Sequence, residues 1–360
     1  MFKNPAIFVC FAQWKRGDFL KKNGSEKGVV EVFQFNGNLP PKFEMMLRGR
    51  NQLVKVSEQG NVIYLQEMAK MNLTSPIKVL DKDNYIYLPT GEVKEFDHKE
   101  NRADDGYVSL RRTFRNLRAL LNTNCSIPEN CRFVTLTYAE NMTDPKKLDF
   151  DVKNFMKRIR QKYLDYQIEY ISIAEPQGRG AWHCHIVLIF DRQAPFIPNN
   201  DIWAMWSPKG FKSSLIEGNK GYDFTSIKRL DNVDNVGAYL TAYLGDLPLD
   251  DADNLGMIDT TKFALKTIIG GDGMPKRILK GARLQLYPPK FNLYRCSRGI
   301  IKPSEEYLEL EQAEKKASAG TLTFDRSYIL SSVACCPALD DCVNIIRQRY
   351  YNTRRKITQD

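Results

Sequence analysis

Two histidines in a short apolar run are the residues whose type and spacing most clearly permit chemistry. His183 and His185 are two of the three histidines in the chain, and they flank Cys184 in the run WHCHIVLIF. In a β-strand, alternate residues project from the same face, so a strand here would place both imidazoles side by side, where they could share one cation. The alternative interpretation is a pair of ordinary buried or edge histidines.

Glu175 is a candidate third ligand for the same cation. It stands eight residues before His183, at the end of an apolar segment and just before the Gly-containing stretch 176–180. If this stretch closes a hairpin, the carboxylate returns toward the imidazoles. Two imidazoles and one carboxylate form a site suited to Mg²⁺ or Mn²⁺, with open positions for substrate oxygens.

Tyr239 and Tyr243 form a second pattern that permits chemistry. They lie four residues apart in GAYLTAYLGD, so on a helix both hydroxyls would project from one face. A tyrosine hydroxyl can attack a phosphodiester when a metal ion polarises the phosphate. The alternative is two core or surface aromatic residues, which are common at this spacing.

Alternating strands and helices in the middle of the sequence would position these residues. β-branched and aromatic content predicts strands at 133–138, 168–174, 182–190 and 224–230. Apolar residues at helical spacing predict helices that begin at Ser109 and at Pro145, and a third helix over 234–244. Antiparallel strands with helices packed on the sheet predict an α+β fold.

The composition indicates a globular protein with an anionic partner. Hydrophobic residues make up 42% of the chain, and 53 Lys and Arg stand against 43 Asp and Glu, which gives a net charge of +10. A surplus of positive charge makes nucleic acid a reasonable partner. No apolar run is long enough to span a bilayer, so we expect a cytoplasmic protein with no membrane partner.

Basic side chains on two predicted helices and on the loop before His183 are candidates for contacts to the DNA backbone. They are Arg111, Arg112, Arg115, Lys157, Arg158 and Arg179. The alternative for each is a solvated charged surface. Trp182, Trp203, Trp206 and Phe211 could stack on unpaired bases or pack in the core.

Changes in composition predict three regions. Residues 1–107 form a β-rich N-terminal region, 108–247 the central α+β domain, and 248–360 a basic C-terminal region that is a candidate for DNA binding. Within the last part, 304–317 reads as a charged helix. The acidic stretch 246–253 reads as a solvated linker.

Three ordered segments resemble the HUH endonucleases, and specifically the rolling-circle replication initiators of bacterial plasmids and phages. They are FVTLTY (133–138), GRGAWHCH (178–185) and YLTAY (239–243). The resemblance implies an HUH endonuclease domain over 108–247, in which His183, His185 and Glu175 bind the metal ion. It also implies that Tyr239 and Tyr243 are nucleophiles. One would nick the origin and remain bonded to the 5′ phosphate, and the other would act in the later strand transfer.

The chain departs from the family pattern at two positions. Two-tyrosine members often carry lysine where this chain has Ala242 and Asp246. A tyrosine has an ordinary pKa near 10, so the attacking hydroxyl needs a proton acceptor at neutral pH. The departure leaves that acceptor open between Asp246 and a hydroxide on the metal ion, and it leaves open which tyrosine acts first.

The resemblance implies a metal-dependent enzyme that nicks and rejoins single-stranded DNA at a replication origin. The sequence contains no G-x-x-x-x-G-K-[ST] phosphate loop, so we expect a host helicase and polymerase as further partners. Two alternatives remain open. One is an HUH relaxase or transposase acting on a transfer origin or element end, and the other is a non-catalytic origin-binding replication protein.

Overall fold

The structure is a computed structural model, and it confirms the predicted α+β fold by combining helices with antiparallel sheets. Within the described part of the chain, the strands form sheets of six, five, three and three strands. The described residues are 30–48, 53–70, 77–96, 107–138, 141–177, 180–207, 225–231, 233, 235–241, 244–249, 265–269, 275–279, 282–288, 291–332 and 343–354.

The five-stranded sheet contains the strands predicted for the middle of the sequence. Its order is β10-β7-β9-β8-β14, and every neighbouring pair is antiparallel. β8 and β9 form the predicted hairpin. The strands are β7 (Cys131–Leu136), β8 (Ile168–Pro176), β9 (Trp182–Phe190), β10 (Thr225–Arg229) and β14 (Tyr294–Cys296).

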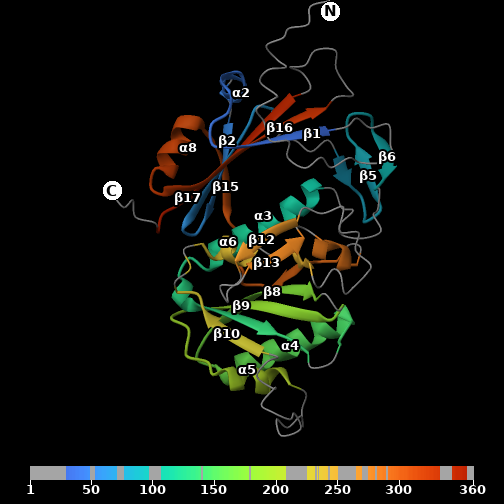
Figure 1. The fold of residues 1–360 in the computed structure, drawn as a ribbon, viewed down its shortest axis with the longest axis vertical. Helices are drawn as coiled ribbons and strands as arrows, with labels where there is room; N and C mark the ends of the chain where they lie inside the picture. Colours follow the sequence, from blue (N-terminus) through green and yellow to red (C-terminus); the bar gives the residue numbers. More distant parts are fainter. Residues whose placement is uncertain are drawn as a thin grey trace, which may run out of the picture.

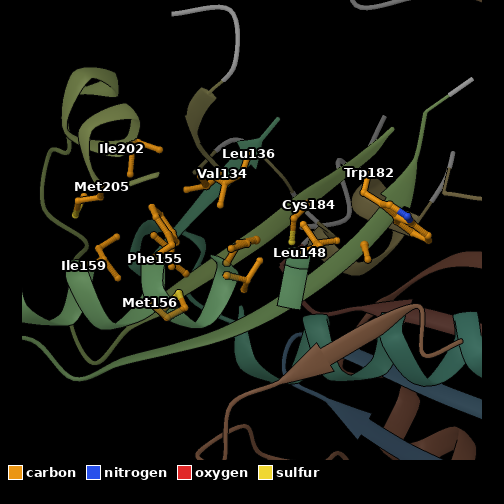
Figure 2. Packing of buried hydrophobic residues seen from close by; sticks show 14 of the residues in the cluster. Val134, Leu136, Leu148, Phe155, Met156, Ile159, Trp182, Cys184, Ile202 and Met205 are labelled. Carbon is orange, nitrogen blue, oxygen red and sulfur yellow. The ribbon is translucent and has the colours of Figure 1, made fainter. Parts of the chain in front are cut away.

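Helices cover both faces of this sheet. On one face lie α4 (Pro145–Lys162) and α5 (Asn199–Trp206), whose apolar side chains pack on Cys184, Ile186 and Leu188 of β9 (Figure 2). On the other face lie α3 (Tyr107–Asn124) and α6 (Val236–Thr241), which pack on Val187. Because side chains alternate along a strand, His183 and His185 point toward the face of α3 and α6.

The predicted helices agree with the structure most closely at α4. Asp144 caps its N-terminus by accepting a hydrogen bond from the backbone N–H of Lys146 at 2.8 Å, and Pro145 is its first residue. The helix α3 begins at Tyr107, so the expected cap at Ser109 is wrong, since that residue lies inside the helix. Helix α6 ends at Thr241 in the described residues and is shorter than predicted.

The six-stranded sheet joins the two ends of the chain (Figure 1). Its order is β1-β16-β17-β3-β2-β15, so strands from the first third pair with strands from the last third. The domain boundaries stay a prediction, but the two flanking regions share one sheet. The strands are β1 (Val30–Asn36), β2 (Leu53–Gln59), β3 (Val62–Met68), β15 (Ser304–Glu309), β16 (Thr321–Ser332) and β17 (Val343–Asn352).

Two short helices complete this sheet. α8 (Leu310–Ala317) buries Ala313 and Ala317 against the valines of β2 and Leu65 of β3. α2 (Pro41–Leu47) buries Leu47 against Ile329 and Ile345. Figure 1 shows α3 between the six-stranded and the five-stranded sheet.

The predicted helix over 304–317 is wrong in its first half. Ser304–Glu309 is the edge strand β15, and only Leu310–Ala317 is helical. The backbone of β15 pairs antiparallel with β2, and Lys55 forms a 2.7 Å ion pair with Glu305 across the two strands. Pairing with a strand about 250 residues earlier overrides the helical preference of the local sequence.

The predicted acidic linker also needs correction at its start. Asp246 is buried, and Leu247 lies in the strand β11 (Leu247–Pro248), which pairs with β13 (Pro275–Leu279). Leu247 packs on Leu279 and Ala282, so these residues belong to the folded structure rather than to a solvated connection. Residues 250–253 lie outside the described part.

The remaining described strands form two small sheets. β12 (Leu265–Ile269) completes the sheet of β11 and β13. β4 (Ile77–Val79), β5 (Asn84–Tyr87) and β6 (Glu92–Glu95) form a separate antiparallel meander. Among the helices that the structure describes, none is long and apolar enough to cross a membrane.

Candidate metal centre and tyrosine helix

The structure brings the three predicted metal ligands together at one end of the β8–β9 hairpin. Glu175 lies directly opposite His183 in the strand register. The Nε2 atoms of His183 and His185 lie 3.2 Å and 2.9 Å from the same carboxylate oxygen, Oε2 of Glu175. Potential ligand atoms of all three residues lie within 4.8 Å of one another.

The turn after Glu175 sets this register. The N–H of Gln177 donates to the carbonyl of Ala181 at 2.7 Å, and the N–H of Gly180 donates to the carbonyl of Gln177 at 2.9 Å. Gly180 has a φ of 80°, in the left-handed region that glycine adopts without a steric penalty. This turn holds the strand pair so that Glu175 and both histidines project from one face. Arg179 lies outside the described residues.

The second ring nitrogen of each histidine also has a neighbour. Nδ1 of His185 lies 3.1 Å from Oγ1 of Thr135, and Nδ1 of His183 lies 3.2 Å from Nε2 of Gln177. The ring of Phe133 stacks on His185 with 5.3 Å between the centroids. Partners at the second nitrogen typically fix the orientation of metal-binding histidines. Here they direct both Nε2 atoms toward Glu175.

The electrostatic environment favours the protonation states that bind a cation. Burial raises the pKa of Glu175, but the two imidazoles and the guanidinium of Arg283 outweigh that effect and hold the pKa well below its usual range. Burial lowers the pKa of His183 and favours its neutral form. An ionised carboxylate and a neutral imidazole are the forms that metal ions bind.

Two further observations show that these residues fit a divalent cation. Nε2 of His183 is buried and has no hydrogen-bond partner, although it lies beside the carboxylate. Buried polar atoms usually have a partner, and a cation would supply one. The separations of 2.9 Å and 3.2 Å between donor atoms also fit, because adjacent ligands at about 2.1 Å from an octahedral ion stand about 3 Å apart.

Helix α6 carries Tyr239 over the sheet face toward which the histidines point. Leu240 is buried in the cluster that contains Val187, whereas the Tyr239 side chain is 54% exposed. A Cβ at Gly237 would meet the carbonyl oxygen of Arg118 at 2.4 Å, so only glycine permits this close approach of α6 to α3. Ala242 and Tyr243 lie outside the described residues.

The comparison with family models identifies the same part of the chain. Residues 131–247 match a family of replication-associated proteins, described by its member ORF2. The matched residues include Glu175, both histidines and both tyrosines, and they cover less than half of the chain. No curated protein and no solved structure matches. The match supports a role in replication.

Arg283 is a site residue that the sequence analysis did not single out. It lies outside the matched residues, in the 3₁₀ helix η5 (Ala282–Leu286), and its Nη1 is 2.6 Å from Oε1 of Glu175. Both side chains are about one-tenth exposed, at 11% and 9%. An arginine in the otherwise apolar run ARLQLY is the sequence signal that could have indicated a buried cation with a carboxylate partner.

The predicted DNA-contacting residues fall into three groups. Arg115 donates to Oε1 of Gln66 at 3.2 Å, and Arg158 donates to the carbonyl of Met205 at 2.6 Å, so both have partners within the protein. Arg112 and Lys157 are exposed. Nothing is described of the Arg111 side chain or of Arg179. DNA contact by any of these residues stays a prediction.

The structure places two of the aromatic candidates in the core. Trp182 is buried and stacks on Phe291 with 4.8 Å between the ring centroids. Trp206 donates from Nε1 to the carbonyl of Thr137 at 2.9 Å and packs beside Tyr138. The core interpretation therefore holds for these two residues. Phe211 lies outside the described part.

Proposed function

We propose that this protein is a rolling-circle replication initiator that nicks and rejoins single-stranded DNA at an origin through a metal-assisted attack by tyrosine. One observation carries the proposal. Glu175, His183 and His185 form a ligand set for a divalent cation, and they project from the sheet face that α6 covers with Tyr239. The replication-associated family match over these residues supports the same function.

A divalent ion, Mg²⁺ or Mn²⁺, held by these three residues would polarise the scissile phosphodiester and stabilise the charge that develops on its oxygens. The hydroxyl of Tyr239 or Tyr243 gives its proton to water, and its oxygen forms a bond to phosphorus. The bond from phosphorus to the 3′ oxygen breaks. The products are a 5′-phosphotyrosine and a free 3′ hydroxyl that primes synthesis, and the reverse attack rejoins the strand.

The surrounding residues support this reaction in separate ways. Glu175 supplies a fixed negative charge between the two imidazoles, and Thr135 and Gln177 orient the rings. The exposure of Tyr239 leaves it accessible to a DNA strand from solvent. Because the sequence has no phosphate-loop motif, the proposal assigns strand separation to a host helicase and extension to a host polymerase.

A relaxase or transposase would use the same chemistry on a different DNA, so the DNA sequence that is cleaved separates these functions from replication initiation. A non-catalytic origin-binding protein is the second candidate. It is favoured by Asp246, which is buried at a position where related proteins carry lysine. It predicts tight DNA binding without a covalent product.

A denaturing gel tests the proposal directly. The full-length protein is incubated with single-stranded fragments from around its own gene, with Mn²⁺ or with EDTA. We expect a protein–DNA adduct that requires the metal ion and disappears in the His183→Ala/His185→Ala double variant. Tight binding to a fragment with no adduct under any condition would contradict the nickase and favour the non-catalytic candidate.

A further inference from the structure

We infer that Arg283 is a positioning residue that fixes the tyrosine-bearing segment against the metal-binding carboxylate. The inference rests on the proposed function for its consequence, but it rests for its geometry on contacts among described residues. Arg283 belongs to the C-terminal region, beyond the residues that match the replication-associated family.

The guanidinium of Arg283 contacts two segments at once. Its Nη1 lies 2.6 Å from Oε1 of Glu175 and donates to the carbonyl of Pro176 at 2.9 Å. Its Nε donates to the carbonyl of Asp246 at 2.8 Å. One planar group therefore joins the end of β8 to the segment that follows the tyrosines.

The backbone of the same residue adds a second connection. The N–H of Arg283 donates to the carbonyl of Gly245 at 3.1 Å, so two consecutive carbonyls after the tyrosines are held by one residue. The segment around Arg283 is itself anchored. Leu247 packs on Leu279 and Ala282, and the hydroxyl of Tyr287 donates to the carbonyl of Ala174 at 2.9 Å.

These contacts divide the work of the Glu175 carboxylate. Oε1 is engaged by Arg283, while Oε2 faces the two imidazoles and remains available to a cation. A guanidinium suits this task because its donors are fixed in one plane and stay charged when buried. The distance from the carboxylate to the tyrosine segment thus depends on Arg283, which lies outside the reach of the cation ligands themselves.

Hydrogen exchange followed by mass spectrometry on the full chain without metal tests the geometry. Arg283→Gln should raise the exchange of residues 236–249 by at least about tenfold while leaving α4 unchanged, because the local opening of this segment becomes easier. Arg283→Lys should fall between the two, since it keeps the charge but loses the fork. Unchanged exchange in 236–249 with Arg283→Gln would overturn the inference.

Arg295→Gln is the matched control. Arg295 also pairs with a carboxylate, Asp149, at 2.7 Å, and it lies close to Arg283 in the sequence. Asp149 belongs to α4, on the opposite face of the sheet. We expect this variant to leave residues 236–249 unchanged. Equal loosening of 236–249 in both variants would show a general loss of stability and would overturn the specific role.

The split between metal binding and chemistry tests the consequence. Because Oε2 and both imidazoles remain in Arg283→Gln, its Mn²⁺ affinity, measured by electron paramagnetic resonance, should fall by less than about tenfold. The rate of adduct formation should fall by about 100-fold, as expected for a displaced reacting group. A loss of metal affinity that equals the loss of rate would overturn positioning of the tyrosine segment. If the unaltered protein forms no adduct, the proposed function fails, but the exchange result still decides the contact.

Discussion

At the scale of residues, the site depends on partners that surround the three ligands. Glu175 is ionised in a buried position because Arg283 and the imidazoles stabilise its charge. His185 is oriented by Thr135 and Phe133, both on the neighbouring strand β7. The ligands themselves are predictable from H-x-H spacing and a hairpin. Their partners are not, because they come from strands and turns whose pairing is set by the whole fold.

Replacing Glu175 by Gln should destabilise the metal-free protein. The change leaves the Arg283 guanidinium buried without its counter-charge, and breaking a buried ion pair costs about 3–5 kcal/mol. The free energy of unfolding in urea measures the effect. Asp149→Asn, which breaks a half-exposed pair with Arg295, should cost about 1 kcal/mol or less. Equal losses in the two variants would contradict the buried pair as a stabilising contact.

Thr135→Val should weaken metal binding without removing a ligand. The hydroxyl that lies beside Nδ1 of His185 is lost, while the β-branched shape that suits the strand is kept. Loss of such a partner reduces metal affinity by about 10–100-fold. Thr137→Val, two residues further along, is the control and should bind Mn²⁺ like the unaltered protein. Equal affinities of the two variants would show that Thr135 does not orient the ring.

At the scale of elements, the hairpin β8–β9 and the helix α4 were predictable, whereas β15 and the extent of α6 were not. Alternating apolar residues identify β9, and the Asp-Pro pair identifies the start of α4. β15 has a charged sequence that favours a helix, and only its pairing with β2 makes it a strand. α6 is held against α3 by contacts of Gly237 and Thr241 that no local pattern encodes.

Gly237→Ala should displace α6 from α3. The added Cβ would meet the carbonyl oxygen of Arg118 at 2.4 Å and Oδ1 of Asn122 at 2.6 Å. Overpacking of this kind costs about 1–3 kcal/mol in the free energy of unfolding. Ala238→Ser, in the same helix, should stay within about 0.5 kcal/mol. An unchanged stability of Gly237→Ala would contradict the close packing of the two helices.

At the scale of the whole molecule, the two ends of the chain form one sheet, and the C-terminal region also supplies β14 and Arg283 to the central part. The sequence analysis divided the chain into consecutive regions because composition changes along the chain are local signals. Pairing between β1 and β16 joins residues about 300 positions apart, and hydrophobic patterning does not specify such partners. The guanidiniums of Arg115 and Arg118 lie between α3 and this sheet, near Gln66 and Tyr350.

Removal of residues 304–360 should unfold the first strands and spare the central sheet. β1, β2 and β3 would lose β16, β15 and β17, respectively, and would expose unpaired strand edges. We expect residues 30–68 to lose protection in hydrogen exchange, while β7, β8 and β9 keep theirs. Retained protection of 30–68 in the truncated chain would contradict the shared sheet.

The central claim is that a tyrosine of the α6 segment attacks DNA beside the cation held by Glu175, His183 and His185. Mass spectrometry of the digested adduct tests it most directly. The account predicts a peptide that contains Tyr239 or Tyr243 and carries a nucleotide through its 5′ phosphate, formed only when a divalent ion is present. A nucleotide on another residue, or one attached without the metal ion, would contradict the account.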